Sequence, residues 1–171
     1  MEKIRQYYKL TKPGVLYANA LSSSAGFLFA SHGHIDLLLF VWLTIGMTLV
    51  IASACVLNNF LDQDIDKLMT RTKKRPLILG TVSGKGAVVF SIVLGLLGVG
   101  VLYATTSVLV TTISVVGFVT YVVLYGMWTK RSSVHGTLVG SVSGAIPILA
   151  GYVAAAGVVD VGAVLVFLVL F

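Results

Sequence analysis

The chain has 171 residues, of which 57% are hydrophobic and 11% charged, and its formal net charge is +6. A soluble domain of this size carries about 25% charged residues, so this chain has too few polar side chains to cover a globular surface. The composition excludes an ordinary soluble enzyme, a disordered protein and a nucleic-acid-binding protein. It indicates an integral membrane protein with several helices.

Apolar segments alternate with short polar links, and each segment is expected to form a helix. A helix needs roughly 20 apolar residues to cross the hydrocarbon core of a bilayer. The segments cover residues 13–30, 37–61, 87–103, 108–128, 136–156 and 158–171. Because the sixth segment is short, we expect the chain to stop inside a helix and to be the N-terminal part of a longer protein. A retained first helix is favoured over a cleaved signal peptide, since equally apolar segments follow it.

The distribution of charge predicts an orientation in the membrane. The 12 Lys and Arg residues fall in three patches, at residues 3–12, 67–85 and 130–131. Alternation of the helices puts all three patches on one side, and the links on the other side contain no Lys or Arg. Basic residues concentrate in cytoplasmic links, so the N-terminus is expected to be cytoplasmic. This pattern explains the positive charge without a nucleic-acid partner.

Small residues recur every fourth position along the fifth segment, at Gly136, Gly140 and Gly144. Such a stripe lets helices approach closely. Pro147, in the same segment, is expected to kink the helix. We interpret the stripe as tight helix packing rather than as substrate contact.

Three of the six acidic residues lie within five positions, after the second segment. On a continuing helix Asn58, Asp62 and Asp66 would share one face over about 12 Å, while Asp64 would point elsewhere. Adjacent carboxylates repel one another unless a cation neutralises them. Mg²⁺ prefers oxygen ligands and commonly joins one or two carboxylates to substrate phosphates. The three residues are therefore candidate catalytic and metal-binding residues for a lipid diphosphate; the alternative is a solvated helix end.

Basic residues near this cluster are candidate ligands of the remaining diphosphate oxygens. They are Lys12, Arg71, Lys74 and Arg75, with Lys130 and Arg131 as weaker candidates. Each of them could instead serve only as a topology signal. Asn19, a polar residue in the first segment, could line the cavity or form a hydrogen bond between helices.

The pattern N-x-x-x-D-x-x-x-D, met by Asn58, Asp62 and Asp66, resembles the first aspartate motif of the UbiA-type intramembrane prenyltransferases. Further stretches resemble, more narrowly, the heme O synthase (protoheme IX farnesyltransferase) branch of that family. They are residues 10–14, 54–66, 69–73, 136–147 and 151–152. The resemblance extends over essentially the whole chain.

This resemblance implies an all-α fold of nine transmembrane helices in the bacterial inner membrane. The chain would hold the first five or six of these helices, as a single prenyltransferase domain over residues 1–171. The implied reaction moves a farnesyl group from farnesyl diphosphate to a vinyl group of heme b, giving heme O. Mg²⁺ is the implied cofactor and heme b a substrate, and a heme-handling or terminal-oxidase assembly partner is also implied. The second aspartate motif of the family is absent from this sequence.

Other interpretations remain open. A related prenyltransferase that acts on an aromatic quinone precursor would share the aspartate motif. A small transporter or scaffold could use the acidic residues to bind a cation. A transporter should, however, place ionisable groups near the middle of the membrane, and the third to fifth segments contain no acidic or basic residue. As a fragment, the chain could also lack activity.

Overall fold

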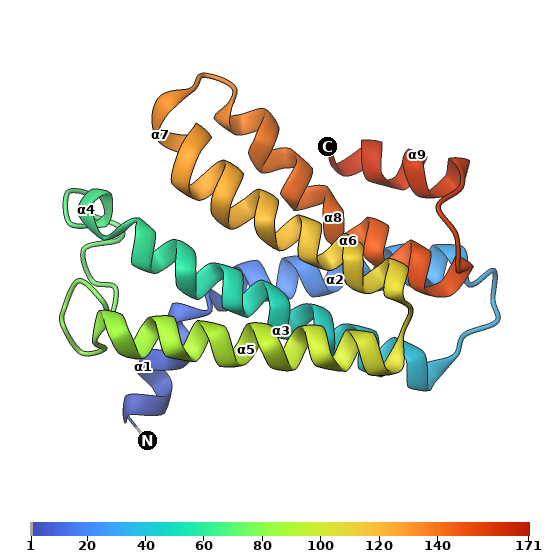
Figure 1. The fold of residues 1–171 in the computed structure, drawn as a ribbon, viewed down its shortest axis with the longest axis horizontal. Coiled ribbons are helices and arrows are strands. Elements are labelled where there is room, and N and C mark those ends of the chain that lie inside the picture. Colours follow the sequence, from blue (N-terminus) through green and yellow to red (C-terminus); the bar gives the residue numbers. More distant parts are fainter. Residues whose placement is uncertain (1) are drawn as a thin grey trace.

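The apolar segments form a bundle of helices that run along a common direction (Figure 1). The computed structural model describes residues 2–171, and every regular element among them is helical, as the composition predicted. The elements are α1 (Glu2–Leu10), α2 (Pro13–Ala30), α3 (Leu37–Leu61), α4 (Gln63–Asp66), α5 (Gly84–Thr105), α6 (Val108–Val119), the π-helix η1 (Thr120–Thr129), α7 (Lys130–Ser132), α8 (Gly136–Ala156) and α9 (Val161–Leu170).

Four helical stretches are long and apolar enough to cross a membrane. They are Leu37–Leu61, Gly84–Thr105, Val108–Ser132 and Gly136–Ala156. The first predicted segment is helical with the expected bounds, as α2, but it is not one of these four. Asn19 and the serines at positions 22–24 make it less apolar than the others. The sixth segment gives the short helix α9.

Side-chain caps fix where several helices begin. Asp36, Ser83, Ser107 and Asp160 each accept a hydrogen bond from the backbone N–H three residues later, at 2.9–3.2 Å. Such a cap satisfies an N–H that has no partner inside the helix. The polar links therefore end the apolar helices at defined positions.

The closest helix pairs are α3 with α5 and α2 with α8. Ser53 and Ser91 join the first pair through reciprocal hydrogen bonds of 2.8 and 2.9 Å to each other's carbonyl oxygens. In the second pair, a Cβ added at Gly151 would lie 1.9 Å from the Ser23 carbonyl oxygen. A Cβ at Gly26 would lie 2.1 Å from the Ile148 carbonyl oxygen. Glycine at both positions lets the two backbones touch.

The predicted role of the Gly136–Gly140–Gly144 stripe was therefore only partly right. A Cβ at Gly136 or Gly140 would meet Thr129 or Tyr125 at 3.0–3.2 Å, but one at Gly144 would meet nothing within 4 Å. Gly144 faces a cavity instead of a helix. The closest approach of α8 to another helix is at Gly151, against Ser23 of α2. Periodicity identified a small-residue face without showing which part of it was covered.

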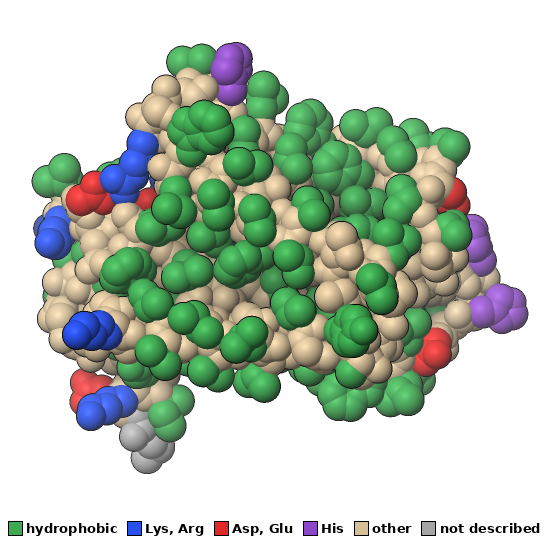
Figure 2. Space-filling view, viewed as in Figure 1, with side chains coloured by type: hydrophobic (Ala, Val, Ile, Leu, Met, Phe, Trp, Pro, Cys, Tyr) green, Lys and Arg blue, Asp and Glu red, His purple; other side chains and the backbone are tan. Residues whose placement is uncertain are grey.

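The two ends of the bundle differ in charge (Figure 2). Lys and Arg side chains gather at the end that carries α1, α4 and α7, together with acidic and His side chains, whereas the opposite end shows acidic and His side chains but no Lys or Arg. This separation matches the predicted distribution of basic residues between the two sets of links.

The second predicted segment ends where α3 ends, at Leu61, and the helix does not continue unbroken through the acidic cluster. Asp62 has φ −88° and ψ 6° and separates α3 from the short helix α4. Even so, Asp62 N–H bonds to the Asn58 carbonyl at 3.0 Å and Asp66 N–H to the Asp62 carbonyl at 2.8 Å. These bonds retain helical spacing across the break.

Candidate active site

The three oxygen-bearing residues singled out in the sequence are buried together at the basic end of the bundle. Asn58, Asp62 and Asp66 are 2%, 3% and 4% exposed. Burial of carboxylates is costly unless they are paired or hydrogen-bonded. The partners of these groups therefore decide what the site can bind.

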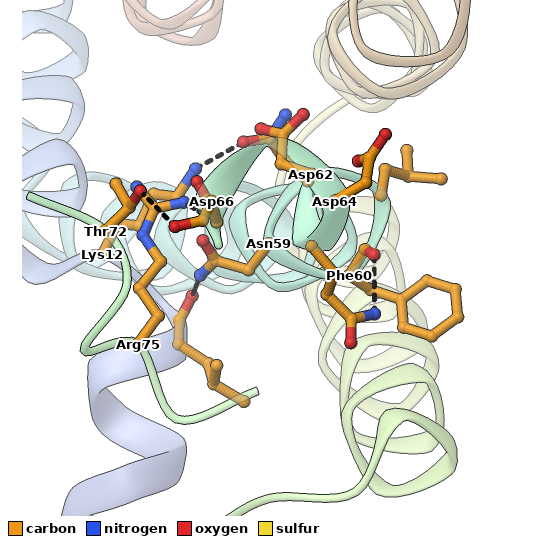
Figure 3. A network of polar contacts seen from close by, with 12 residues as sticks. Lys12, Asn59, Phe60, Asp62, Asp64, Asp66, Thr72 and Arg75 are labelled. Carbon is orange, nitrogen blue, oxygen red and sulfur yellow. Dashed lines mark hydrogen bonds and ion pairs between the residues drawn. The ribbon is translucent and has the colours of Figure 1, made fainter. Parts of the chain in front are cut away.

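Asp66 is paired with Arg75. The Arg75 Nη1 atom donates to Asp66 Oδ2 at 2.5 Å, and the Asp66 side chain is only 5% exposed. The buried Thr72 hydroxyl donates to the Asp66 backbone carbonyl at 3.0 Å. Lys12, Thr72 and Arg75 lie on one side of this segment, close to Asp66, whereas Asp64 points to the other side (Figure 3).

Asp62 is paired with Lys130, the first residue of α7, which directly follows η1. Lys130 Nζ donates to Asp62 Oδ2 at 2.6 Å and lies 5.8 Å from the centre of the Tyr125 ring. Tyr125 in turn stacks on Tyr121, with ring centres 5.8 Å apart. π-Helices are rare and occur frequently at functional sites. Here η1 contacts α3, and Lys130, directly after η1, reaches the acidic cluster.

Lys12 reaches the cluster from the link before α2, where its Nζ atom donates to Asn58 Oδ1. Its backbone is left-handed, with φ 53°, a conformation that costs energy in a non-glycine residue and is favoured here only by its surroundings. Burial lowers the pKa of the Lys12 ammonium to about 8. Close by, Asn59 Nδ2 donates to the Leu10 carbonyl at 2.7 Å and fixes the link against α3.

The other predicted basic residues lie apart from the buried acids. Arg131 donates to both oxygens of Asp64 at 2.7 and 2.8 Å and to the Leu61 carbonyl. This contact lowers the pKa of the exposed Asp64 carboxyl. Arg71 and Lys74 are exposed in the link after α4, and neither makes a salt bridge within residues 2–171. The structure thus groups Lys12, Arg75 and Lys130 around the acids.

An apolar cavity of about 190 Å³ lies within the bundle next to this cluster. Its wall includes Ala54 and Cys55, one helical turn before Asn58, and Tyr121 of η1. Asn19 also lies on the wall, and its amide donates within its own helix to the Val15 carbonyl, not to another helix. The polar cluster therefore adjoins an apolar space.

Two atoms of the cluster are buried without a partner in the described part of the chain, and one of them fits an added cation while the other, Asn58 Nδ2, is a hydrogen-bond donor. Asp62 Oδ1 is buried and has no hydrogen-bond partner among the described residues. The Asp62 and Asp66 carboxylates and the Asn58 carbonyl supply oxygen donors, which Mg²⁺ prefers. Within residues 2–171 no three His, Cys, Asp or Glu side chains form a metal-binding group. A Mg²⁺ ion held here would need waters or substrate phosphates to complete its ligands.

Sequence reasoning missed several residues that shape the site. Asn59, Thr72, Tyr121 and Tyr125 are ordinary polar or aromatic residues in the sequence, and their roles depend on partners distant in the chain. The π-helix offered no signal in the apolar pattern. Lys130, ranked as a weak candidate, contacts Asp62 directly.

Comparison with known proteins identifies close relatives of this chain. Residues 19–171 match the model of the UbiA prenyltransferase family. The chain is 45% identical over 166 residues to the protoheme IX farnesyltransferase of Photorhabdus laumondii, covering 97% of this chain and 56% of the relative. It is 44% identical over 165 residues to the enzyme of the same name from Acinetobacter baylyi, covering 96% of this chain and 56% of the relative. The chain therefore spans about half the length of these relatives.

Two solved structures share the fold. A digeranylgeranylglyceryl phosphate synthase superposes with a TM-score of 0.85 at 24% identity, covering 99% of this chain and 59% of the other. A UbiA homologue from Archaeoglobus fulgidus, bound to GPP and Mg²⁺, superposes with a TM-score of 0.73 at 18% identity, covering 89% and 53%. Both confirm the all-helical fold predicted from the sequence.

Proposed function

Because the chain belongs to the UbiA prenyltransferase family, we propose that the protein transfers a farnesyl group from farnesyl diphosphate to a vinyl group of heme b, giving heme O. The observation that carries the proposal is the similarity, at 44–46% identity over nearly the whole chain, to proteins named protoheme IX farnesyltransferase. The buried cluster of Asn58, Asp62 and Asp66 beside an apolar cavity supports the reaction class.

The basic residues of the cluster would bind the diphosphate. Arg75, Lys130 and Lys12 each contact an oxygen of the cluster, and an incoming diphosphate offers them further anionic oxygens. Arg can bind such oxygens through two parallel hydrogen bonds. As the bond between the farnesyl C1 atom and oxygen breaks, negative charge grows on the leaving diphosphate. Fixed cations at that place stabilise the transition state.

Asp62, Asp66 and Asn58 would hold Mg²⁺ through their oxygen atoms, with the unpaired Asp62 Oδ1 as a free donor atom. Mg²⁺ bound there supplies Lewis-acid stabilisation of the departing diphosphate. Lys130 and Arg75 pair with the two carboxylates. We infer that these side chains turn toward the diphosphate when substrate is present.

The apolar cavity would hold the farnesyl chain and keep water away from its cationic carbon. Its wall beside the cluster is formed by Ala54, Cys55 and Tyr121. The vinyl group of heme b attacks the farnesyl C1 atom and forms the new carbon–carbon bond. Water then adds to the other vinyl carbon and loses a proton, which gives the hydroxyethylfarnesyl group. Exclusion of water before that point prevents loss of the farnesyl cation.

We further propose that the protein lies in a bacterial inner membrane with its N-terminus in the cytoplasm. The gathering of Lys and Arg side chains at one end of the bundle supports this orientation (Figure 2), because such residues are enriched on the cytoplasmic side. The proposed partners of the protein are farnesyl diphosphate, heme b and the lipid bilayer. An oxidase-assembly partner is not proposed.

The test is heme O formation by membranes that express this chain in a host lacking its own heme O synthase. The assay contains farnesyl diphosphate, heme b and Mg²⁺. Asp62→Ala is the test variant, and Asp64→Ala is the matched control because Asp64 faces Arg131 and not the cluster. A second form extends the chain past Phe171 with the corresponding region of a relative.

The proposal is supported if either form makes heme O, if Asp62→Ala abolishes this activity and if Asp64→Ala retains it. Product from the extended form alone would assign the activity to the longer protein. Absence of heme O from both forms would overturn the heme assignment. Prenylation of an aromatic quinone precursor by the same membranes would then identify the alternative acceptor.

A further inference from the structure

Helix α1 lies at the basic end of the bundle and runs across the direction of α3 and α5 (Figure 1). It is the first element of the chain and covers Glu2–Leu10. A helix placed crosswise at the end of a transmembrane bundle lies along the membrane surface and does not enter the hydrocarbon core.

One face of α1 holds it against the protein. Leu10 is fully buried, and the Tyr7 ring packs edge-on against Phe90 of α5, with ring centres 5.0 Å apart. The Leu10 carbonyl accepts the hydrogen bond from Asn59, next to the acidic cluster. The orientation of α1 is therefore fixed by contacts with α3 and α5.

A second face of α1 is apolar and uncovered. Ile4 and Tyr8 are 74% and 48% exposed, and residues four apart share one side of a helix. The Tyr8 and Tyr17 hydroxyl groups are hydrogen-bonded at 2.8 Å, which ties this face to the first turns of α2. Tyrosine is enriched at membrane–water interfaces because its ring is apolar and its hydroxyl is polar.

The neighbouring face is basic, and its charges are not used within the protein. Arg5 and Lys9 are exposed and, four residues apart, share this face. Elsewhere α1 carries Lys3 and one acidic residue, Glu2. The salt bridges within residues 2–171 involve Arg75, Lys130 and Arg131 instead. Three basic residues and one acidic residue leave α1 with a net charge of +2.

We propose that α1 is an interfacial helix that binds the headgroups of anionic phospholipids. Ile4 and Tyr8 insert at the boundary between headgroups and acyl chains, while Arg5 and Lys9 contact the lipid phosphates. A helix with an apolar face and an adjacent basic face suits this position. Binding there also holds the Leu10–Lys12 link against the acidic cluster. The inference does not depend on the prenyl-transfer activity.

The test measures lipid binding to the full chain in neutral detergent by native mass spectrometry, with phosphatidylglycerol and phosphatidylcholine as the probes. The variant Arg5→Gln/Lys9→Gln removes the basic face of α1. The matched control, Lys67→Gln/Lys73→Gln, removes the same charge from the exposed link after α4. We expect wild type and control to prefer phosphatidylglycerol, and the α1 variant to lose about five-fold in affinity for each residue replaced.

A second measurement locates α1 relative to the bilayer. In a Cys55→Ala background, nitroxides are attached at Ile4→Cys or Arg5→Cys in vesicles of mixed phosphatidylcholine and phosphatidylglycerol. We expect the label at position 4 to be the more accessible of the two to oxygen, which concentrates in the lipid. We expect the label at position 5 to be the more accessible to a water-soluble relaxation agent. Equal exposure of both labels to water would overturn the proposal. So would an equal loss of lipid preference in the two Gln variants, or burial of both labels between two copies of the chain.

Discussion

Lys130 Nζ lies 2.6 Å from Asp62 Oδ2, although 68 positions separate the two residues in the chain. The contact joins the first residue of α7 to the residue that follows α3. The local sequence pattern gives no sign that these two segments meet. Both side chains are largely buried, at 28% and 5% exposure. Loss of either partner would leave a buried group unpaired.

Replacement of Lys130 by Gln is expected to destabilise the protein, because Asp62 would lose its charged partner in a buried site. The expected loss in the free energy of unfolding is about 1 to 3 kcal/mol. Thermal unfolding in detergent, followed by circular dichroism, measures it. Arg131→Gln is the control, since Arg131 pairs with the exposed Asp64 and exposed pairs contribute little. Equal destabilisation by both variants would contradict the prediction.

The activity is expected to fall as the pH rises through about 8, the pKa to which burial lowers the Lys12 ammonium from 10.5. Below this pH Lys12 is charged and can bind diphosphate, and above it the charge is lost. The measurement is the pH profile of kcat/KM for farnesyl diphosphate, which reports groups of the free enzyme. Lys12→Arg keeps the charge, so its profile should lack the fall; an unchanged fall would exclude Lys12 as its source.

The same shift makes Lys12 a cost to stability. Because its folded pKa lies below its unfolded value, the charged form is disfavoured in the folded state. The cost is fully present below pH 8 and disappears as the pH rises toward 10.5. The stability of the wild-type protein should therefore rise between about pH 8 and 10.5, and Lys12→Met, which has no ammonium group at this position, should lack this rise. Thermal unfolding of both proteins at about pH 8 and at about pH 10.5 tests the sign of this change in stability.

Gly151→Ala is expected to force α2 and α8 apart, because the new Cβ would lie 1.9 Å from the Ser23 carbonyl oxygen. Overpacking of this kind costs about 1 to 3 kcal/mol. Gly144→Ala is the matched control on the same helix, since a Cβ there meets nothing within 4 Å. Thermal unfolding of the two variants should separate them, and equal stability would refute the assignment of the close contact to Gly151.

Gly144→Leu is expected to fill part of the apolar cavity without disturbing helix packing. Gly144 lines the cavity and has free space beside it. A bulkier side chain there should lower kcat/KM for farnesyl diphosphate by about ten-fold or more, with little change in unfolding temperature. A wild-type value of kcat/KM would show that the farnesyl chain does not use this cavity.

Composition and periodicity were enough to determine the membrane class, the all-helical fold and the bounds of α2, α3 and α8. These features follow from local chemistry: apolar runs must form helices in lipid, and polar links with capping residues end them. The spacing of Asn58, Asp62 and Asp66 likewise predicted their common location, since neighbouring turns of a helix share a face.

Only the tertiary structure decided which basic side chains contact the acidic residues and at which glycines the helices approach most closely. Lys130, directly after η1, pairs with Asp62, Arg75 pairs with Asp66, and Arg131 pairs with Asp64. These choices depend on how helices distant in the sequence pack against one another. A charge pattern gives the side of the membrane on which a residue lies, but the partner of a buried charge is set by the three-dimensional position of both side chains.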